Sequence, residues 1–98
     1  MTSIELEIRN PSGLHARPAA VFVRAASKFH SDIRLQNLTT DRPEADAKSI
    51  LGVLTAGVAR GHRIRLVAEG DDAEQSIAEL RALIDSGLGE ALDADAAP

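Results

Sequence analysis

The sequence contains no cysteine, tryptophan or tyrosine, and its only aromatic residues are two phenylalanines. Without cysteine, neither a disulfide framework nor a thiolate metal site can form, which suits a reducing compartment. Hydrophobic residues make up 44% of the 98 positions, and because only two of them are aromatic, the core must be largely aliphatic. This length is enough for one domain with a single core.

The sequence also lacks long hydrophobic runs. No stretch approaches the roughly 20 apolar residues that a membrane-spanning helix needs. The first seven residues, Met-Thr-Ser-Ile-Glu-Leu-Glu, have no basic region followed by an apolar run, as a secretory signal would. We therefore expect a cytoplasmic protein that does not insert into a membrane.

The 11 lysine and arginine residues are outnumbered by 15 acidic ones, but they are locally concentrated. The formal net charge of −4 argues against nucleic acid as a partner. Residues 8–31 contain no acidic side chain, and their basic ones are Arg9, Arg17, Arg24 and Lys28. Residues 71–98, in contrast, hold eight acidic side chains and one basic one. A local basic surface on an acidic protein suits phosphate binding and docking onto acidic partners; chance clustering of solvated charges is the alternative.

Apolar periodicity predicts strands and helices in alternation. Period-two alternation indicates strands at about residues 4–9, 32–36 and 63–68, and a short edge strand is expected within 37–46, where Pro43 is best tolerated. Helical spacing indicates helices at about 18–27, 50–57 and 73–87. Ser49 is the expected N-cap of the second helix, and Asp72 to Gln75 has the spacing of a capping box before the third. We expect that helix to end at Gly87.

The resulting order, βαββαβα, predicts an α+β fold of two layers. An antiparallel sheet would be covered on one side by helices, whereas the pattern alone leaves the strand order open. Residues 91–98 have little to bury. We expect them to form a flexible tail or the start of a linker.

One segment, residues 10–20, is expected to present a histidine at the start of a helix. Turn residues end the preceding strand by Asn10, and Pro18 suits a first helical turn, so His15 falls at or just before the N-cap. The first N–H groups of a helix lack internal acceptors, and Arg17 adds a full charge, so an anion beside His15 would be stabilised. A neutral imidazole is a competent nucleophile. This combination favours phosphorylation of the ring, with a cap or surface histidine as the ordinary alternative.

Residues 13–19, Gly-Leu-His-Ala-Arg-Pro-Ala, closely resemble the active-site signature of HPr. HPr is the phosphocarrier of the bacterial phosphoenolpyruvate-dependent sugar phosphotransferase system. Residues 47–54 look like the second motif of that family, a Lys-Ser segment that opens a short helix beside the active site. The resemblance covers about residues 3–90, which would form one HPr-like domain within 1–90. Within the family, residues 37–38, 61–63, 72–75 and 87–90 look most like the HPr-like domains of fructose-specific phosphotransferase proteins.

The resemblance implies a four-stranded open-faced sandwich with strand order 1-4-2-3 and three helices on one face. His15 would accept a phosphoryl group on Nδ1 from enzyme I and pass it to an enzyme IIA domain. Arg17 would pair with the phosphate oxygens, within a phosphate-binding segment formed by Ala16, Arg17 and Pro18. Such a monomeric carrier needs no cofactor or metal and is not a self-sufficient enzyme.

Two further features concern the expected second helix. Its four large apolar residues cannot all face inward, so part of the set should be exposed for docking. The expected docking residues are Arg24, Lys28, Lys48, Ile50, Leu51 and Leu54. In HPr of many Gram-positive bacteria the serine corresponding to Ser49 is phosphorylated, which would add a serine kinase as a partner; a plain N-cap is the alternative.

A second function remains open, namely an HPr-like regulatory module that binds proteins without relaying phosphate. Retention of both His15 and Arg17 favours the carrier.

Overall fold

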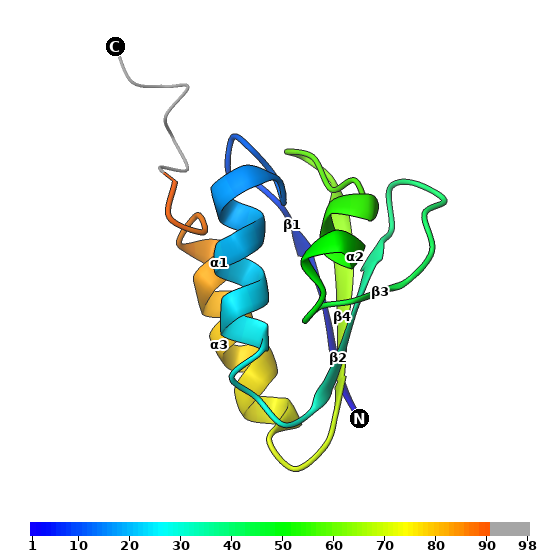
Figure 1. Ribbon diagram of the computed structural model, residues 1–98, viewed down its shortest axis with the longest axis vertical. Coiled ribbons are helices and arrows are strands. Elements are labelled where there is room, and N and C mark those ends of the chain that lie inside the picture. The colour runs from blue at the N-terminus through cyan, green and yellow to red at the C-terminus, as the bar shows by residue number, and fades with distance from the viewer. Residues whose placement is uncertain (91–98) are drawn as a thin grey trace.

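The computed structural model of the protein describes residues 1–90 (Figure 1). Its strands are β1 (Thr2–Glu7), β2 (Asp32–Asn37), β3 (Ala45–Asp46) and β4 (Arg63–Glu69), and its helices are α1 (Ala16–Ala26), α2 (Ile50–Thr55) and α3 (Ala73–Asp85). The predicted order of elements is therefore confirmed. The expected tail, residues 91–98, lies outside the described residues.

The four strands form one antiparallel sheet in the order β1-β4-β2-β3. The three helices lie together on one face of it (Figure 1). The short strand β3, expected somewhere within residues 37–46, lies at the edge of the sheet, as predicted. The open-faced α+β sandwich is confirmed, including the strand order that only the family resemblance had suggested.

The core lies between these two layers. Alternation along β2 and β4 turns one set of side chains inward, so that Leu35 is paired in register with Leu66 and both are fully buried. Phe22 from α1 and Leu80 from α3 are also fully buried. The other side of the sheet is polar, with an exposed ion pair of 2.9 Å between Arg65 Nη2 and Glu5 Oε2. Helix and strand periodicity therefore lead to the same hydrophobic core.

The start of α3 differs from the prediction. Asp72 is the N-cap residue, but its side chain makes no capping hydrogen bond. Its carboxylate instead accepts hydrogen bonds from the backbone N–H of His30 (2.8 Å), the N–H of Ser31 (2.9 Å) and the Ser31 hydroxyl. The predicted capping box is wrong because these donors, which lie in the loop between α1 and β2, are brought close only by the tertiary fold.

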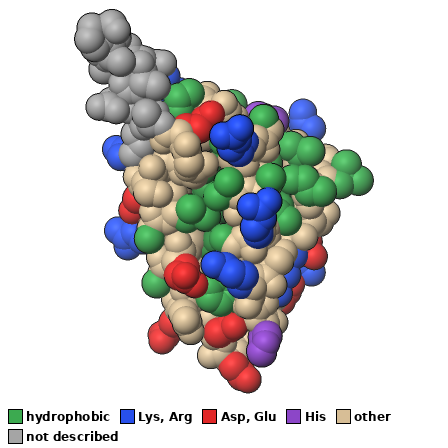
Figure 2. Space-filling view, turned by 60° about the vertical axis from the view of Figure 1, so that its left-hand side comes forward, with side chains coloured by type: hydrophobic (Ala, Val, Ile, Leu, Met, Phe, Trp, Pro, Cys, Tyr) green, Lys and Arg blue, Asp and Glu red, His purple; other side chains and the backbone are tan. Residues whose placement is uncertain are grey.

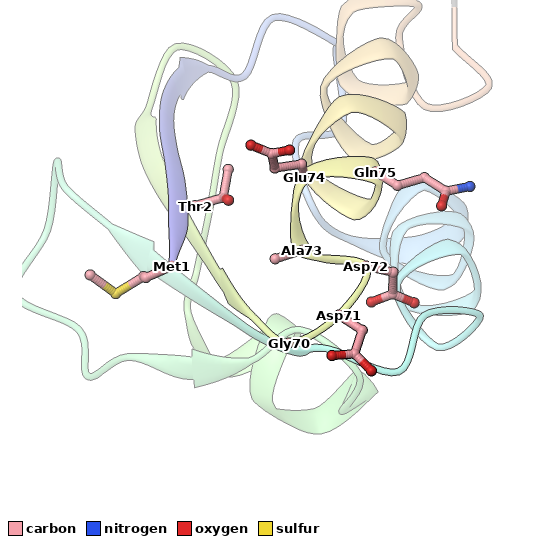
Figure 3. Close-up of a pocket in the computed structure, with 8 residues that line it drawn as sticks. All are labelled: Met1, Thr2, Gly70, Asp71, Asp72, Ala73, Glu74 and Gln75. Atoms are coloured by element: carbon pink, nitrogen blue, oxygen red, sulfur yellow. The ribbon is translucent and has the colours of Figure 1, made fainter.

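The loop that carries Asp72 also lines a hollow with an acidic border (Figure 3). Its lining residues are Met1, Thr2, Gly70, Asp71, Asp72, Ala73, Glu74 and Gln75. The hollow lies at the opposite end of the molecule from the start of α1 (Figure 1). The two ends of the helical layer therefore differ in their charged groups, acidic here and basic around Arg17.

We predict that Asp72 contributes to the acid stability of the fold. Hydrogen bonds from the Ser31 hydroxyl and the His30 N–H lower the pKa of Asp72 from 3.8 to about 2. A lowered pKa means that the stabilisation is complete above the unfolded pKa and is lost as the pH falls from about 4 through about 2. Asp72→Asn should therefore unfold at a lower temperature at neutral pH and lose less stability between pH 4 and pH 2.

Thermal unfolding followed by circular dichroism across this pH range checks the prediction. Asp71→Asn is the matched control, because Asp71 is the neighbouring exposed carboxylate. Unfolding curves of Asp72→Asn that run parallel to those of the wild type through the acid range would contradict it.

Candidate functional site

The loop before α1 is held by contacts at both of its ends. Asn10 is fully buried, and its Nδ2 donates to the Gly13 carbonyl at 3.0 Å, while the Gly13 N–H donates back to the Asn10 carbonyl at 3.2 Å. Leu14 is also fully buried, and its N–H donates to the Val58 carbonyl at 3.0 Å. These contacts therefore hold the backbone in place immediately before His15.

His15 is the N-cap residue of α1, as predicted. Its backbone is extended, with φ −127° and ψ 163°, and the residue is exposed to solvent. Ala16 has φ +53°, in the left-handed region that a residue with a Cβ rarely adopts, at a cost on the order of 1–3 kcal/mol. Such strain persists only where surrounding contacts determine the conformation, and it is found at ligand sites more often than elsewhere.

The first turn of α1 is suited to an anion. Ala16 and Arg17 are exposed, and no acidic residue lies in this turn. Unpaired N–H groups, the helix dipole and the Arg17 guanidinium together favour negative charge beside the His15 ring. Pro18 is buried and has no N–H, so it supports the turn by packing and offers no hydrogen bond to an anion.

A residue distant in sequence also reaches this loop. The Glu90 carboxylate accepts hydrogen bonds from Asn10 Nδ2 (3.0 Å), the Ser12 N–H (2.9 Å) and the Ser12 hydroxyl (2.8 Å). These bonds, first of all the one from Asn10, lower the pKa of Glu90, and the charge of Arg17 adds to the effect. Sequence reasoning missed this group, because nothing local to Glu90 relates it to a turn 78 residues away.

The second helix has the exposed apolar surface that its composition predicts. The exposed fractions of Ile50, Leu51 and Leu54 are 45%, 73% and 39%, whereas Val53 is fully buried. Ser49 is confirmed as the N-cap, since its hydroxyl accepts the Gly52 N–H at 3.0 Å. One short helix thus buries a single large side chain and leaves three available to a partner.

Basic residues lie beside this apolar surface. Arg24 is exposed on α1, which packs against α2, and Lys28 is exposed in the turn that follows α1. Figure 2 shows hydrophobic and basic side chains interspersed over the middle of this face, with acidic side chains toward its lower end. Lys48 differs from the other predicted docking residues: it is half-buried, and its Nζ donates to the Phe29 carbonyl at 2.6 Å.

The other two histidines lie outside this site. His30 is exposed near the start of α3. The Nδ1 atom of His62 accepts the Ala59 N–H at 3.1 Å and lies 3.2 Å from Asn37 Nδ2, which places the ring proton on Nε2. Within residues 1–90, no three histidine, aspartate or glutamate side chains are grouped as a metal site would require. None of the described helices is long and apolar enough to cross a membrane.

Comparison with known proteins identifies the family. The family model described as "PTS HPr component phosphorylation site" matches residues 2–86. The chain belongs to the HPr family. Its crystal-structure neighbours include HPr-C-His from Thermoanaerobacter tengcongensis, with a TM-score of 0.86 and 48% identity over 92% of this chain and 98% of that one. A dimer of HPr from the same organism superposes with a TM-score of 0.71, at 48% identity, covering 92% of this chain and 100% of the dimer's chain.

Curated relatives of this HPr-family chain include multiphosphoryl transfer proteins and HPr-like proteins. The Multiphosphoryl transfer protein of Haemophilus influenzae is 49% identical over 87 residues, which cover 89% of this chain but 17% of that protein. The HPr-like protein Crh of Bacillus subtilis is 37% identical over 84 residues, covering 86% of this chain and 95% of Crh. The chain thus spans 17% of the Haemophilus influenzae protein and 23% of the Multiphosphoryl transfer protein of Salmonella typhimurium. The resemblance to fructose-type phosphotransferase domains agrees with these findings.

We predict that Gly13 is required for the loop conformation. Its φ is +61°, and a Cβ there would overlap the Val58 carbonyl oxygen and lie 2.8 Å from Ala59 Cα. Because both neighbours are backbone atoms, Gly13→Ala should destabilise the protein by about 2 kcal/mol or more. It should also move the backbone amide signal of His15 in NMR spectra.

Denaturant unfolding measures the effect on stability. Gly61→Ala is the matched control, since Gly61 has φ +90° but no atom within 4 Å of the added Cβ. This control isolates the cost of the positive φ. Equal destabilisation by both substitutions would show that the contact with Val58 is unimportant.

Proposed function

We propose that the chain accepts a phosphoryl group on His15 Nδ1 from the phosphohistidine of enzyme I and passes it to an enzyme IIA domain. Membership in the HPr family implies a phosphocarrier of the phosphotransferase system. One observation carries the assignment to His15. The ring is exposed at the N-terminus of α1, with Arg17 two residues along the chain and no acidic residue in the same turn.

In the proposed transfer, the lone pair of Nδ1 attacks the phosphorus atom while the P–N bond to the donor histidine breaks. Charge spreads over the three equatorial oxygens, which need donors that do not react themselves. The N–H groups of Ala16 and Arg17 and the Arg17 guanidinium are the proposed donors. Pro18 is buried and lacks an N–H, so its proposed role is to support the conformation of the first turn of α1 by packing. Transfer onward reverses the step, with His15 as the leaving group.

We propose that partners dock on the adjoining surfaces of α1 and α2. Ile50, Leu51 and Leu54 offer apolar contacts, and Arg24 and Lys28 provide the positive charge that suits acidic partner faces. Lys48 contributes charge, although its ammonium group already binds the Phe29 carbonyl. A phosphate on Ser49 would add negative charge to this surface, so a serine kinase is a proposed regulatory partner. The capping bond to Gly52 supports the plain structural role.

The second candidate function is a regulatory module that docks proteins without relaying phosphate. The similarity to Crh, the catabolite repression HPr of Bacillus subtilis, supports it. Retention of His15 and Arg17 favours the carrier. Our proposal includes a cytoplasmic location, a single domain within residues 1–90 and a monomeric state, although a dimer of a related HPr has been solved.

We predict that enzyme I and phosphoenolpyruvate will convert the wild-type protein to a single acid-labile phosphoryl adduct. His15→Ala should remove the adduct completely, because the nucleophile is lost. His30→Ala is the matched control and should be phosphorylated like the wild type, since His30 lies outside the site. Mass spectrometry under neutral conditions measures the adduct. A wild-type protein left unmodified by active enzyme I would favour the docking module.

We predict that Arg17→Ala slows transfer in both directions by roughly 100-fold, the usual cost of losing one donor to the transition-state charge. The fold should remain intact, because Arg17 is exposed. Arg17→Lys should recover part of the rate through its charge. Arg81→Ala, which removes an exposed arginine of α3, is the control. Stopped-flow transfer rates for Arg17→Ala equal to those of the control would remove Arg17 from the mechanism.

A further inference from the structure

The Glu90 side chain makes several hydrogen bonds to the loop before α1. Glu90 is half-buried, and both of its carboxylate oxygens are used. Oε1 accepts hydrogen bonds from Asn10 Nδ2 and the Ser12 N–H, and Oε2 accepts the Ser12 hydroxyl. One side chain from the segment after α3 therefore binds three donors on a turn that ends at His15.

We propose that Glu90 is a positioning residue for phosphoryl transfer at His15 and acts through Asn10 and Ser12. The inference rests on the proposed function where it concerns transfer between proteins. Glu90 does not touch the reacting atoms. Its role is to select the loop conformation in which the His15 ring and the first N–H groups of α1 face the same phosphoryl group.

The hydrogen bonds of Asn10 connect Glu90 to the backbone that precedes His15. Asn10 Nδ2 donates to Glu90 and to the Gly13 carbonyl at once, so the carboxylate orients the amide that also holds Gly13. Gly13 is followed directly by Leu14, whose N–H binds Val58, and then by His15. Bonds to an ionised acceptor are roughly twice as strong as bonds between neutral groups. The carboxylate therefore supplies strong hydrogen bonds to the turn that precedes the site.

The strained residue in the site explains why such support is needed. Ala16, next to His15, has φ +53°, a conformation that is maintained only where its neighbours impose it. Leu14 and α1 constrain the chain on the two sides of this residue, and Glu90 constrains the turn before Leu14. Loss of the carboxylate would let the turn relax. Small misplacements of a reacting group can reduce rates by up to about 100-fold.

A purely structural role predicts a different result. If Glu90 only fastens the end of the chain, its removal lowers the melting temperature and leaves the chemistry at His15 unchanged below that temperature. If Glu90 positions the loop, reaction at His15 slows while the protein is still folded. A small phosphoryl donor separates the two roles without requiring a partner protein.

The experiment uses phosphoramidate and the full 98-residue chain. Nδ1 of His15 attacks phosphorus, the P–N bond to the leaving amine breaks, and ammonia is released. We expect Glu90→Gln to react on His15 about tenfold more slowly than the wild type at a temperature where both are folded. Glu79→Gln, a substitution of an exposed glutamate on α3, is the matched control and should react at the wild-type rate. Ser12→Ala, which loses only the hydroxyl bond, should lie between them.

Further measurements complete the test. Amide hydrogen exchange should show faster exchange of the Ser12 N–H in Glu90→Gln than in Glu79→Gln. With enzyme I as donor, Glu90→Gln should lower kcat and leave KM unchanged, because the docking residues of α1 and α2 are intact. If Glu90→Gln does not fold, Ser12→Ala and Glu90→Asp carry the comparison, and Glu90→Asp should be slower than the wild type because its shorter side chain cannot keep all three bonds.

Two results would overturn the inference. The first is equal phosphoramidate rates for Glu90→Gln and Glu79→Gln despite faster exchange at Ser12. The second is no reaction of wild-type His15 with phosphoramidate. A wild-type protein that reacts with phosphoramidate on His15 but not with enzyme I would instead refute the proposed function, and the phosphoramidate rates would still decide the role of Glu90.

Discussion

The site depends on a buried leucine. Leu14 has no exposed surface, and its N–H donates to the Val58 carbonyl in the segment between α2 and β4. Because burial of a leucine side chain is worth on the order of 1.5–3 kcal/mol, the chain is held firmly at this point. The next residue, His15, is exposed and begins α1. A reactive side chain can therefore stay in solvent without being mobile, because the hydrophobic core holds the residue before it.

The helical layer gives the site its chemical setting. Helix α1 directs its unpaired N–H groups and Arg17 to the end of the molecule where His15 lies, and α2 adds the exposed Leu51 beside α1. The acidic groups around Asp72 lie at the other end (Figures 1 and 3). This separation keeps negative side chains away from the anion that the site is proposed to hold. Glu90 is the exception, and its charge is bound by Asn10 and Ser12.

Local patterns identified most of this arrangement. The spacing of Ala19, Phe22 and Ala26 indicated α1, and all three are buried as helical periodicity requires. Ser49 was identified as an N-cap because a hydroxyl before an apolar run satisfies a nearby amide. The same kind of reasoning failed at Asp72, whose carboxylate found better donors at His30 and Ser31. Capping rules describe neighbours along the chain and cannot weigh them against donors from another loop.

The sequence by itself determined the order of the elements, the position of His15 at a helix start and the exposure of part of α2. These features depend on periodicity and on residues a few positions apart, where chain connectivity sets the geometry. Only the tertiary structure decided that Val58 holds Leu14, that Glu90 reaches Ser12 and that the Lys48 ammonium is engaged by Phe29. Each of these contacts joins residues at least 19 positions apart. Their proximity arises from packing the helical layer on the sheet, which no local pattern encodes.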